Sequence, residues 1–209
     1  LLQMLALTTM EKPKSFSPDD IRIEKIKLLK SIKPIPIDKI DKYAFRAQYK
    51  SGNIEKEGHV KGYLEELEND KSVVETYAAI KLFIDNPRWK NIPIYLRTAK
   101  RLNQSGTFIS IKFKNNQGNK KSANNWMVFS IQPKESTYFE IQTKVPGLNE
   151  VDLRATRLEG MNRLDQDEKI DAYETLMLDL LEGNQSRFLH IDEVKAAWTA
   201  FQEAQAVPE

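Results

Sequence analysis

Between residues 43 and 155 the sequence repeatedly alternates apolar and polar residues with a period of two, and this pattern constrains the fold most. Such alternation predicts β-strands with one covered face. We expect strands at residues 43–49, 74–84, 92–96, 107–114, 126–131, 137–143 and 151–155. Because these strands follow one another without regular intervening helices, we expect antiparallel pairing and an α+β layout.

Helical patterns lie at both ends of the chain. Residues 1–11 are apolar on nearly every side and have no capping residue before them, so we expect a buried helix in which the chain begins. Ser17 is a suitable N-cap for a second helix, and Pro18 suits its first position. We expect this helix to expose its lysines, namely Lys25, Lys27 and Lys30.

The C-terminal region is also predicted to be helical. Asp171 and Glu174 have the spacing of a capping box, and Gly183 is a suitable stop. The apolar residues within 173–181 and 194–201 recur at helical spacing, which predicts two helices whose stripes lie in the core. The polar stretches 51–70 and 115–125 are expected to be a long excursion and a hairpin connection. We therefore predict one domain over residues 1–209, a large and mostly antiparallel β-sheet with helices packed on one face.

Composition excludes several classes of protein. With 40% hydrophobic residues, 30% charged residues and a net charge of +2, the 209-residue chain is expected to be soluble, and it lacks the basic footprint of most nucleic-acid-binding proteins. The absence of cysteine excludes disulfides and thiol catalysis and suits a cytoplasmic protein. Residues 1–7 have neither the features of a signal peptide nor the length to span a membrane. We expect neither nucleic acid nor membrane as a partner.

Motifs for cofactor or metal binding are missing from the sequence. No two of the eight glycines lie closer than four residues, so a dinucleotide fingerprint cannot form. A P-loop and a nucleophile elbow are also absent. His59 and His190 are far apart and have no zinc-binding spacing. The residues alone therefore predict neither a catalytic residue nor a metal site.

The strand predicted at residues 92–96 runs into three basic residues, Arg97, Lys100 and Arg101. Cations that converge at the end of a buried strand can hold an anion or a polyhydroxylated ligand. The alternative is that these side chains are simply solvated, which is the usual state of Lys and Arg.

Several blocks around this strand end resemble a known family. They fall in one order and cover nearly the whole chain: LLQMLALTTMEKP at 1–13, GYLEE at 62–66, ETYAAIK at 75–81, IDNPRW at 84–89, YLRTAKRL at 95–102, IQP at 131–133, KVPG at 144–147 and DAYE at 171–174. Together they resemble the C-terminal domain of glucose-6-phosphate dehydrogenase.

The resemblance implies an NADP-dependent oxidoreductase that converts glucose 6-phosphate to 6-phosphogluconolactone in the pentose phosphate pathway. In this family the NADP-binding domain precedes the region matched here, and the catalytic histidine is implied to lie directly before Leu1. The chain is then expected to be a fragment of a longer protein and inactive by itself. Its implied contribution is one wall of the substrate site and a subunit contact.

The family motifs imply three substrate-binding residues. Lys100 matches a lysine that contacts glucose 6-phosphate, and Gln132 matches a glutamine near the substrate in some members. Arg97 matches an arginine of the same block, which in some members lies near a second, structural NADP and otherwise is expected to pair with a carboxylate. From the residues alone, Gln132 can equally be the polar end of a strand before a proline.

The sequence also departs from the family pattern. Ala99 replaces a usual glycine and would be strained if its φ were positive. Ser105 replaces a second Lys or Arg that contacts the sugar. Ser130, Gly106 and Glu140 stand where cations for a structural NADP are expected, so we predict no second NADP site.

The resemblance further implies a homodimer that forms through the sheet. Two other functions stay open at this point. One is a non-catalytic interaction or regulatory protein built from the same domain. The other is a sheet that binds single-stranded nucleic acid through exposed aromatic residues, which the low net charge disfavours.

Overall fold

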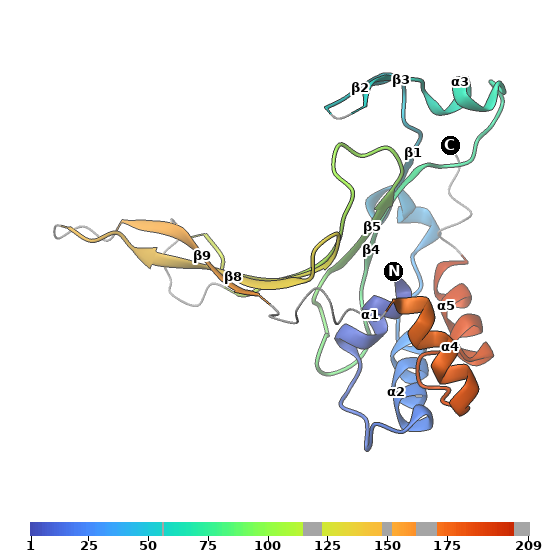
Figure 1. Ribbon diagram of the computed structural model, residues 1–209, viewed down its shortest axis with the longest axis vertical. Coiled ribbons are helices and arrows are strands. Elements are labelled where there is room, and N and C mark those ends of the chain that lie inside the picture. Colours follow the sequence, from blue (N-terminus) through green and yellow to red (C-terminus); the bar gives the residue numbers. More distant parts are fainter. Residues whose placement is uncertain (56, 115–122, 148–151, 162–170, 203–209) are drawn as a thin grey trace. The chain divides into compact units, whose positions relative to one another are not determined.

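A computed structural model describes residues 1–55, 57–114, 123–147, 152–161 and 171–202 (Figure 1). Antiparallel sheets and several helices confirm the predicted α+β class. The fold separates into two compact units, one formed by residues 1–103 together with 170–209 and the other by residues 104–169. The predicted strands are thus divided among separate sheets rather than joined in one hydrogen-bonded sheet.

The first unit contains a three-stranded antiparallel sheet in the order β1-β4-β5. Its strands are β1 (Ala44–Ala47), β4 (Tyr77–Leu82) and β5 (Ile94–Ala99). Ala44 pairs with Ile80, and Tyr77 pairs with Ala99. An isolated bridge between Ile32 and Ile84 extends the far end of β4. Each of these strands begins and ends within a few residues of its predicted position.

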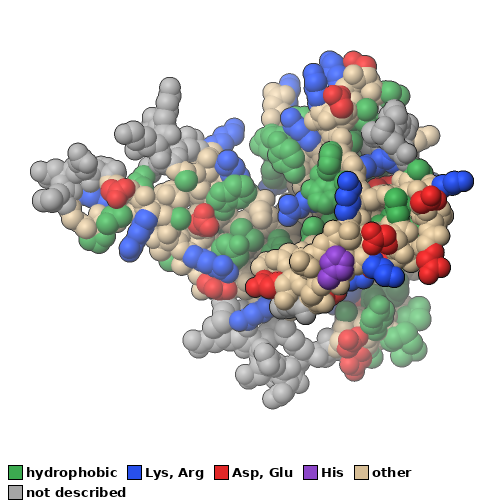
Figure 2. Space-filling view, turned by 90° about the horizontal axis from the view of Figure 1, so that it is seen from above, with side chains coloured by type: hydrophobic (Ala, Val, Ile, Leu, Met, Phe, Trp, Pro, Cys, Tyr) green, Lys and Arg blue, Asp and Glu red, His purple; other side chains and the backbone are tan. Residues whose placement is uncertain are grey.

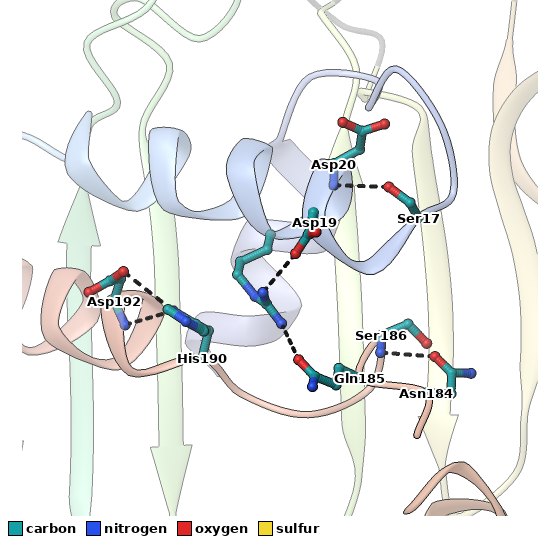
Figure 3. Close-up of polar contacts among 9 residues, drawn as sticks. Ser17, Asp19, Asp20, Asn184, Gln185, Ser186, His190 and Asp192 are labelled. Carbon is teal, nitrogen blue, oxygen red and sulfur yellow. Dashed lines mark hydrogen bonds and ion pairs between the residues drawn. The ribbon is translucent and has the colours of Figure 1, made fainter. Parts of the chain in front are cut away.

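The four longest helices of this unit lie near the two ends of the chain. They are α1 (Leu2–Thr9), α2 (Pro18–Lys30), α4 (Ala172–Glu182) and α5 (Ile191–Phe201), as drawn in Figure 1. The predicted N-cap of α2 is confirmed, because Ser17 Oγ accepts a hydrogen bond from the Asp20 amide at 3.2 Å (Figure 3). Asp171 caps α4 in the same way, and Gly183 ends α4 with a φ of 71°.

The core of the first unit lies between the helices and one face of the sheet. The alternation in β4 places Leu82 on this face together with Ile84, and both side chains are fully buried, as predicted. Helix residues supply the opposite side of the core, namely Leu5, Ala6, Leu28, Leu29 and Ala196. The prediction that the apolar face of β1 is covered is wrong at Phe45, which is 61% exposed, because the register turns Ala44 to the core side beside Ile80.

Lys25 is not on an exposed face as predicted, but is buried between helices. Its Nζ lies 2.8 Å from Glu193 Oε2, and only 6% and 1% of the two side chains are exposed. Gln3 joins the pair: its Oε1 accepts from Lys25 Nζ, and its Nε2 donates to Glu193 Oε2, each at 3.1 Å. This network connects α1, α2 and α5 through charged groups that composition alone would place at the surface.

Most of the predicted core stripe of α4 is also exposed. Tyr173 is 80% exposed and Leu181 is 81% exposed, whereas the buried residue of this helix is Asp179. Asp179 is turned inward because Arg187 and Asn184 bind its two carboxylate oxygens at 2.6 and 3.0 Å. In α5 the most buried residues are Glu193 and Ala196. Of its predicted stripe, Ala197 and Phe201 are partly buried against the core, whereas Trp198 is 62% exposed.

The predicted excursion at 51–70 contains regular structure. It comprises a hairpin formed by β2 (Gly52–Ile54) and β3 (Gly58–Val60), followed by the short helix α3 (Tyr63–Leu67). A 3₁₀ helix, η1 (Ile37–Lys42), lies between α2 and β1. Within the predicted range, we call residues 52–67, which contain these elements, the excursion.

The second unit is a four-stranded antiparallel sheet in the order β6-β7-β8-β9. The strands are β6 (Thr107–Lys112), β7 (Trp126–Gln132), β8 (Ser136–Lys144) and β9 (Leu153–Met161). Consecutive register partners form an apolar row across the sheet, Ile111, Met127, Phe139 and Leu158. The predicted connection at 115–125 falls mostly outside the described residues.

Candidate functional site

The end of β5 presents two of the predicted site residues. Leu96 packs against the core, so the alternation of the strand places Arg97 on the opposite face, where it pairs in register with Ala79. Lys100 follows the last strand residue, and its amide donates to the Thr76 carbonyl at 2.8 Å. Both side chains are exposed, and neither makes an ion pair with a carboxylate among the residues that the structure describes.

Arg101 behaves differently from these two cations. Its Nη1 lies 2.8 Å from Glu57 Oε2, and its Nη2 lies 2.6 Å from Glu66 Oε1. The second oxygen of Glu66 accepts a 2.6 Å hydrogen bond from the Tyr49 hydroxyl. We call these four residues the Arg101 cluster. The sequence indicates the arginine but not its acidic partners Glu66 and Glu57, because they lie 35 and 44 residues away in the chain.

Electrostatics within the Arg101 cluster favour the charged carboxylate. The hydrogen bond from Tyr49 lowers the pKa of Glu66 below its ordinary value, and the positive charge of Arg101 lowers this pKa further. The same hydrogen bond raises the pKa of the Tyr49 phenol, because the phenol donates its proton to an anionic group. Glu66 is therefore an anion and Tyr49 a neutral donor at neutral pH.

Ala99 is not strained. The non-glycine residues with positive φ in the described backbone are Glu68, Asn91 and Arg101. Ala99 instead continues the β5 ladder opposite Tyr77. The left-handed conformation falls two residues later, at Arg101, which has a φ of 54°. The departure from the usual glycine thus has no conformational cost here.

A cavity of ≈ 510 Å³ lies in the first unit, beside the core-side face of β4 and β5. Its lining is mostly apolar, and Thr98 at the end of β5 is one of its few polar residues. The other lining residues come from α1, α5, the segment before α5 and the sheet, and include Leu2, Ile80, Leu96, Val194, Trp198 and Phe201.

Gln132 lies in the second unit, at the end of β7, where it pairs with Thr107 beside a register shift and precedes a cis peptide bond to Pro133. It is exposed. Nearby, Ser130 Oγ donates to the Lys134 carbonyl at 2.7 Å, and Glu140 pairs in register with Trp126 and Arg157.

Among the described contacts, neither histidine bonds to a predicted site residue, namely Arg97, Lys100 or Gln132. His190 caps α5, where its Nδ1 accepts from the Asp192 amide at 3.2 Å (Figure 3). His59 pairs with Asn53 in the β2–β3 hairpin. Among the described residues, no group of three His, Cys, Asp or Glu side chains could hold a metal ion.

Surface charge and hydropathy add two observations. On the face drawn in Figure 2, Lys and Arg side chains are interspersed with Asp and Glu rather than gathered into one basic patch. In the described part of the chain, no helix has the length and apolar character needed to cross a membrane.

Comparison with known proteins identifies the family. The profile of the family described as "Glucose-6-phosphate dehydrogenase, C-terminal domain" matches residues 1–208. The chain belongs to this family. The fold agrees with the assignment, because a solved structure titled "Glucose-6-phosphate dehydrogenase in complex with its substrate glucose-6-phosphate" matches 98% of the chain with a TM-score of 0.82 and 33% identity.

Curated relatives give the same result. The chain is 39% identical over 95% of its length to a glucose-6-phosphate 1-dehydrogenase of Gluconobacter oxydans, and 39% identical over 96% to one of Chlamydia trachomatis. It spans 41% and 47% of the length of these two relatives. The resemblance predicted from sequence blocks is therefore confirmed, and it concerns the C-terminal part of a dehydrogenase.

Within this family, the predicted site residues are distributed over both units. Arg97 and Lys100 come from one strand end, whereas Gln132 comes from the other unit. The roles of all three residues stay predictions, and so do the effects of Ser105 and Gly106.

Proposed function

We propose that the chain acts as the C-terminal part of an NADP-dependent glucose-6-phosphate dehydrogenase. Its role is to supply one wall of the sugar-phosphate site and a contact between subunits, with residues 1–209 acting as one functional domain. The observation that supports this most is the family match over residues 1–208, in a fold similar to that of a dehydrogenase solved with glucose 6-phosphate. We expect a cytoplasmic protein.

Lys100 is proposed to bind the substrate. Its side chain is exposed and makes no described ion pair, so the cation is available to an anionic ligand. The ammonium can donate up to three hydrogen bonds to phosphate or sugar oxygens, and Lys is ordinarily protonated at neutral pH. Arg97 and Gln132 are proposed as further polar contacts of the substrate.

The chemical step is assigned to groups outside this chain. Bound NADP would accept a hydride from the sugar. The residues described here can bind and orient the phosphate-bearing substrate, but His190 is used as a helix cap and His59 lies within a hairpin. We therefore assign the general base and the main NADP contacts to the part of the dehydrogenase that the chain does not match. The chain alone should not reduce NADP.

A second, structural NADP is not proposed. Its phosphates would need cations, but Ser130 uses its hydroxyl on the Lys134 carbonyl, and Glu140 contributes a carboxylate. Binding of nucleic acid is disfavoured by the mixed charges on the face in Figure 2.

The apolar row of the second unit is proposed as part of a homodimer contact. Phe139 is 40% exposed and Leu158 is 53% exposed, although both belong to a continuous apolar row across four strands. Exposed apolar surface of this kind is typical of subunit interfaces. A second copy of the chain would cover it and lower its exposure to water.

Kinetics of the full-length dehydrogenase test the substrate assignment. Lys100→Ala should raise the KM for glucose 6-phosphate by about tenfold or more, the effect of losing a charged hydrogen-bond donor, with little change in the KM for NADP. The matched control is Lys33→Ala, which removes an exposed cation from the opposite end of β4. Equal values of KM for Lys100→Ala and the control would remove Lys100 from the site.

A further inference from the structure

Arg101 combines an unusual backbone conformation with two ion pairs. Its φ of 54° is in the left-handed region, which non-glycine residues rarely adopt because Cβ crowds the backbone. It directly follows Lys100, the residue proposed to bind the substrate phosphate. A conformation of this kind persists only where surrounding contacts determine it, so the contacts of Arg101 identify what holds this turn.

Those contacts all come from the excursion and the residues beside it. Glu57 lies between β2 and β3, and Glu66 lies in α3. The two carboxylates bind different nitrogens of Arg101, and Tyr49 holds Glu66 from the other side. A further bond links the same segments, because the Glu55 amide donates to Asn103 Oδ1 at 3.4 Å.

We propose that Arg101 is a positioning residue, which fixes the direction of Lys100 by tying the end of β5 to the excursion. The proposal rests on the proposed function, because it assumes that Lys100 binds glucose 6-phosphate. It adds a role for the excursion, whose own side chains then support the substrate site without touching the substrate.

The geometry explains why a second anchor is needed. The Lys100 amide is bound to the Thr76 carbonyl, which fixes the strand side of the residue. Arg101 fixes the other side through its left-handed turn and its two ion pairs. The lysine side chain is a flexible four-carbon stem, and holding its backbone on both sides reduces the entropy lost when it binds an anion.

Charge also matters in this arrangement. Two carboxylates bind Arg101, the next residue in the chain, and if unpaired they could compete with the substrate phosphate for the Lys100 ammonium. Because Arg101 occupies one oxygen of Glu57 and one of Glu66, and Tyr49 occupies the second oxygen of Glu66, these acids are largely satisfied. Removing Arg101 would leave both carboxylates without this cation, and uncompensated negative charge near a bound phosphate weakens the binding of an anion.

Steady-state kinetics of the full-length dehydrogenase test the proposal. Arg101→Gln should raise the KM for glucose 6-phosphate by roughly three- to tenfold, the range expected for a network of exposed charges, and should leave kcat and the KM for NADP within about twofold. Arg101→Lys keeps one cation and should give an intermediate KM. Lys33→Gln, which breaks an exposed ion pair at the opposite end of β4, is the control and should match the wild type.

Arg101→Gly separates the side chain from the backbone. Glycine adopts a positive φ freely, so this variant keeps the turn but loses both ion pairs. It should raise KM as Arg101→Gln does. A wild-type KM for Arg101→Gly would overturn the proposal, because the ion pairs would then have no part in binding. Glu66→Gln and Tyr49→Phe leave Arg101 in place and should each raise KM by a smaller factor.

The outcomes distinguish the positioning role of Arg101 from the proposal that Lys100 binds glucose 6-phosphate. If Lys100→Ala leaves the KM for glucose 6-phosphate unchanged, the substrate assignment fails and the role of Arg101 fails with it. If Lys100→Ala raises KM but Arg101→Gln does not, only the positioning role is overturned. A parallel loss of kcat and of affinity for both substrates in Arg101→Gln would indicate a general structural defect, and would also overturn it.

Discussion

Breaking the buried ion pair between Lys25 and Glu193 should strongly destabilise the first unit. At the 2.8 Å separation of Nζ and Oε2, the attraction is about 6 kcal/mol at an effective dielectric constant of 20. Removing both charges from water costs several kcal/mol per ion, so the pair gains little net stability. The cost of losing one partner is different, because the remaining charge stays buried without compensation.

Single substitutions measure that cost. Lys25→Met leaves Glu193 only 1% exposed and without its cation, and should lower the free energy of unfolding by about 3–5 kcal/mol. Glu193→Leu should have a similar effect, because it strands the Lys25 ammonium with Gln3 as its only partner in the network. Urea denaturation of the chain, followed through its three tryptophans, supplies the assay.

The double variant Lys25→Met/Glu193→Leu tests the physical reason. It removes both charges together, so its remaining cost should be only about 1–3 kcal/mol, which arises from the unpaired Gln3 amide. The double variant should therefore be more stable than either single one. Lys33→Met breaks a half-exposed pair with Asp85 and serves as the control, with an expected loss of about 1 kcal/mol or less. A loss no larger than the control for Lys25→Met would refute the reasoning.

Three further predictions concern the strand end, the second unit and the Arg101 cluster. Ala99→Gly restores the usual family residue but should lower the free energy of unfolding by about 0.5–1 kcal/mol in urea denaturation, because Ala99 lies in a strand and has no positive φ; a gain in stability would contradict this. Phe139→Glu with Leu158→Glu should shift the protein from dimer to monomer in sedimentation, whereas Ser110→Glu, at an exposed position of β6, should not; a dimer that survives the double change would exclude this face. The pKa of Glu66, measured by NMR of its carboxyl carbon, should be below 4.5 and should rise in Tyr49→Phe. Tyr49, Arg101 and Lys61 lower this pKa in the folded state. The cluster should therefore stabilise the fold fully at a pH above the unfolded-state pKa of glutamate, and should lose this contribution as the pH falls through the lowered pKa of Glu66. An unshifted titration would contradict this.

Local patterns in the sequence predicted local structure well. The alternation at residues 74–84 and 107–114 correctly located β4 and β6, and Ser17 and Asp171 correctly located two helix starts. These features depend on neighbouring residues, whose periodicity and capping chemistry are visible in one stretch of chain. The family blocks likewise depend on order and spacing alone.

Features that depend on distant partners were not predictable in this way. Lysine is a residue type that is usually exposed, so the sequence gives no sign that Lys25 is buried. Only the packing of α2 against α5 brings Glu193 to it. The stripe of α4 was correctly recognised as apolar, but periodicity does not say what covers a face. The buried residue of α4 is Asp179, not a residue of the apolar stripe, because Arg187 donates a hydrogen bond to its carboxylate. Charge pairing thus decided both burial patterns, through a partner far along the chain for Lys25 and through one only eight residues away for Asp179.

The strand end illustrates the same limit at the candidate site. The family motif usually has a glycine at the position of Ala99, which suggests a turn there. Ala99 is instead paired with Tyr77 and belongs to strand β5. The chain leaves the sheet only after the Lys100 amide has bonded to Thr76, so the left-handed turn falls at Arg101. The residue that carries this turn also carries the ion pairs to the excursion. A substitution at the motif glycine is therefore tolerated here, while the orientation of Lys100 comes to depend on Glu57 and Glu66, residues that no local motif connects to it.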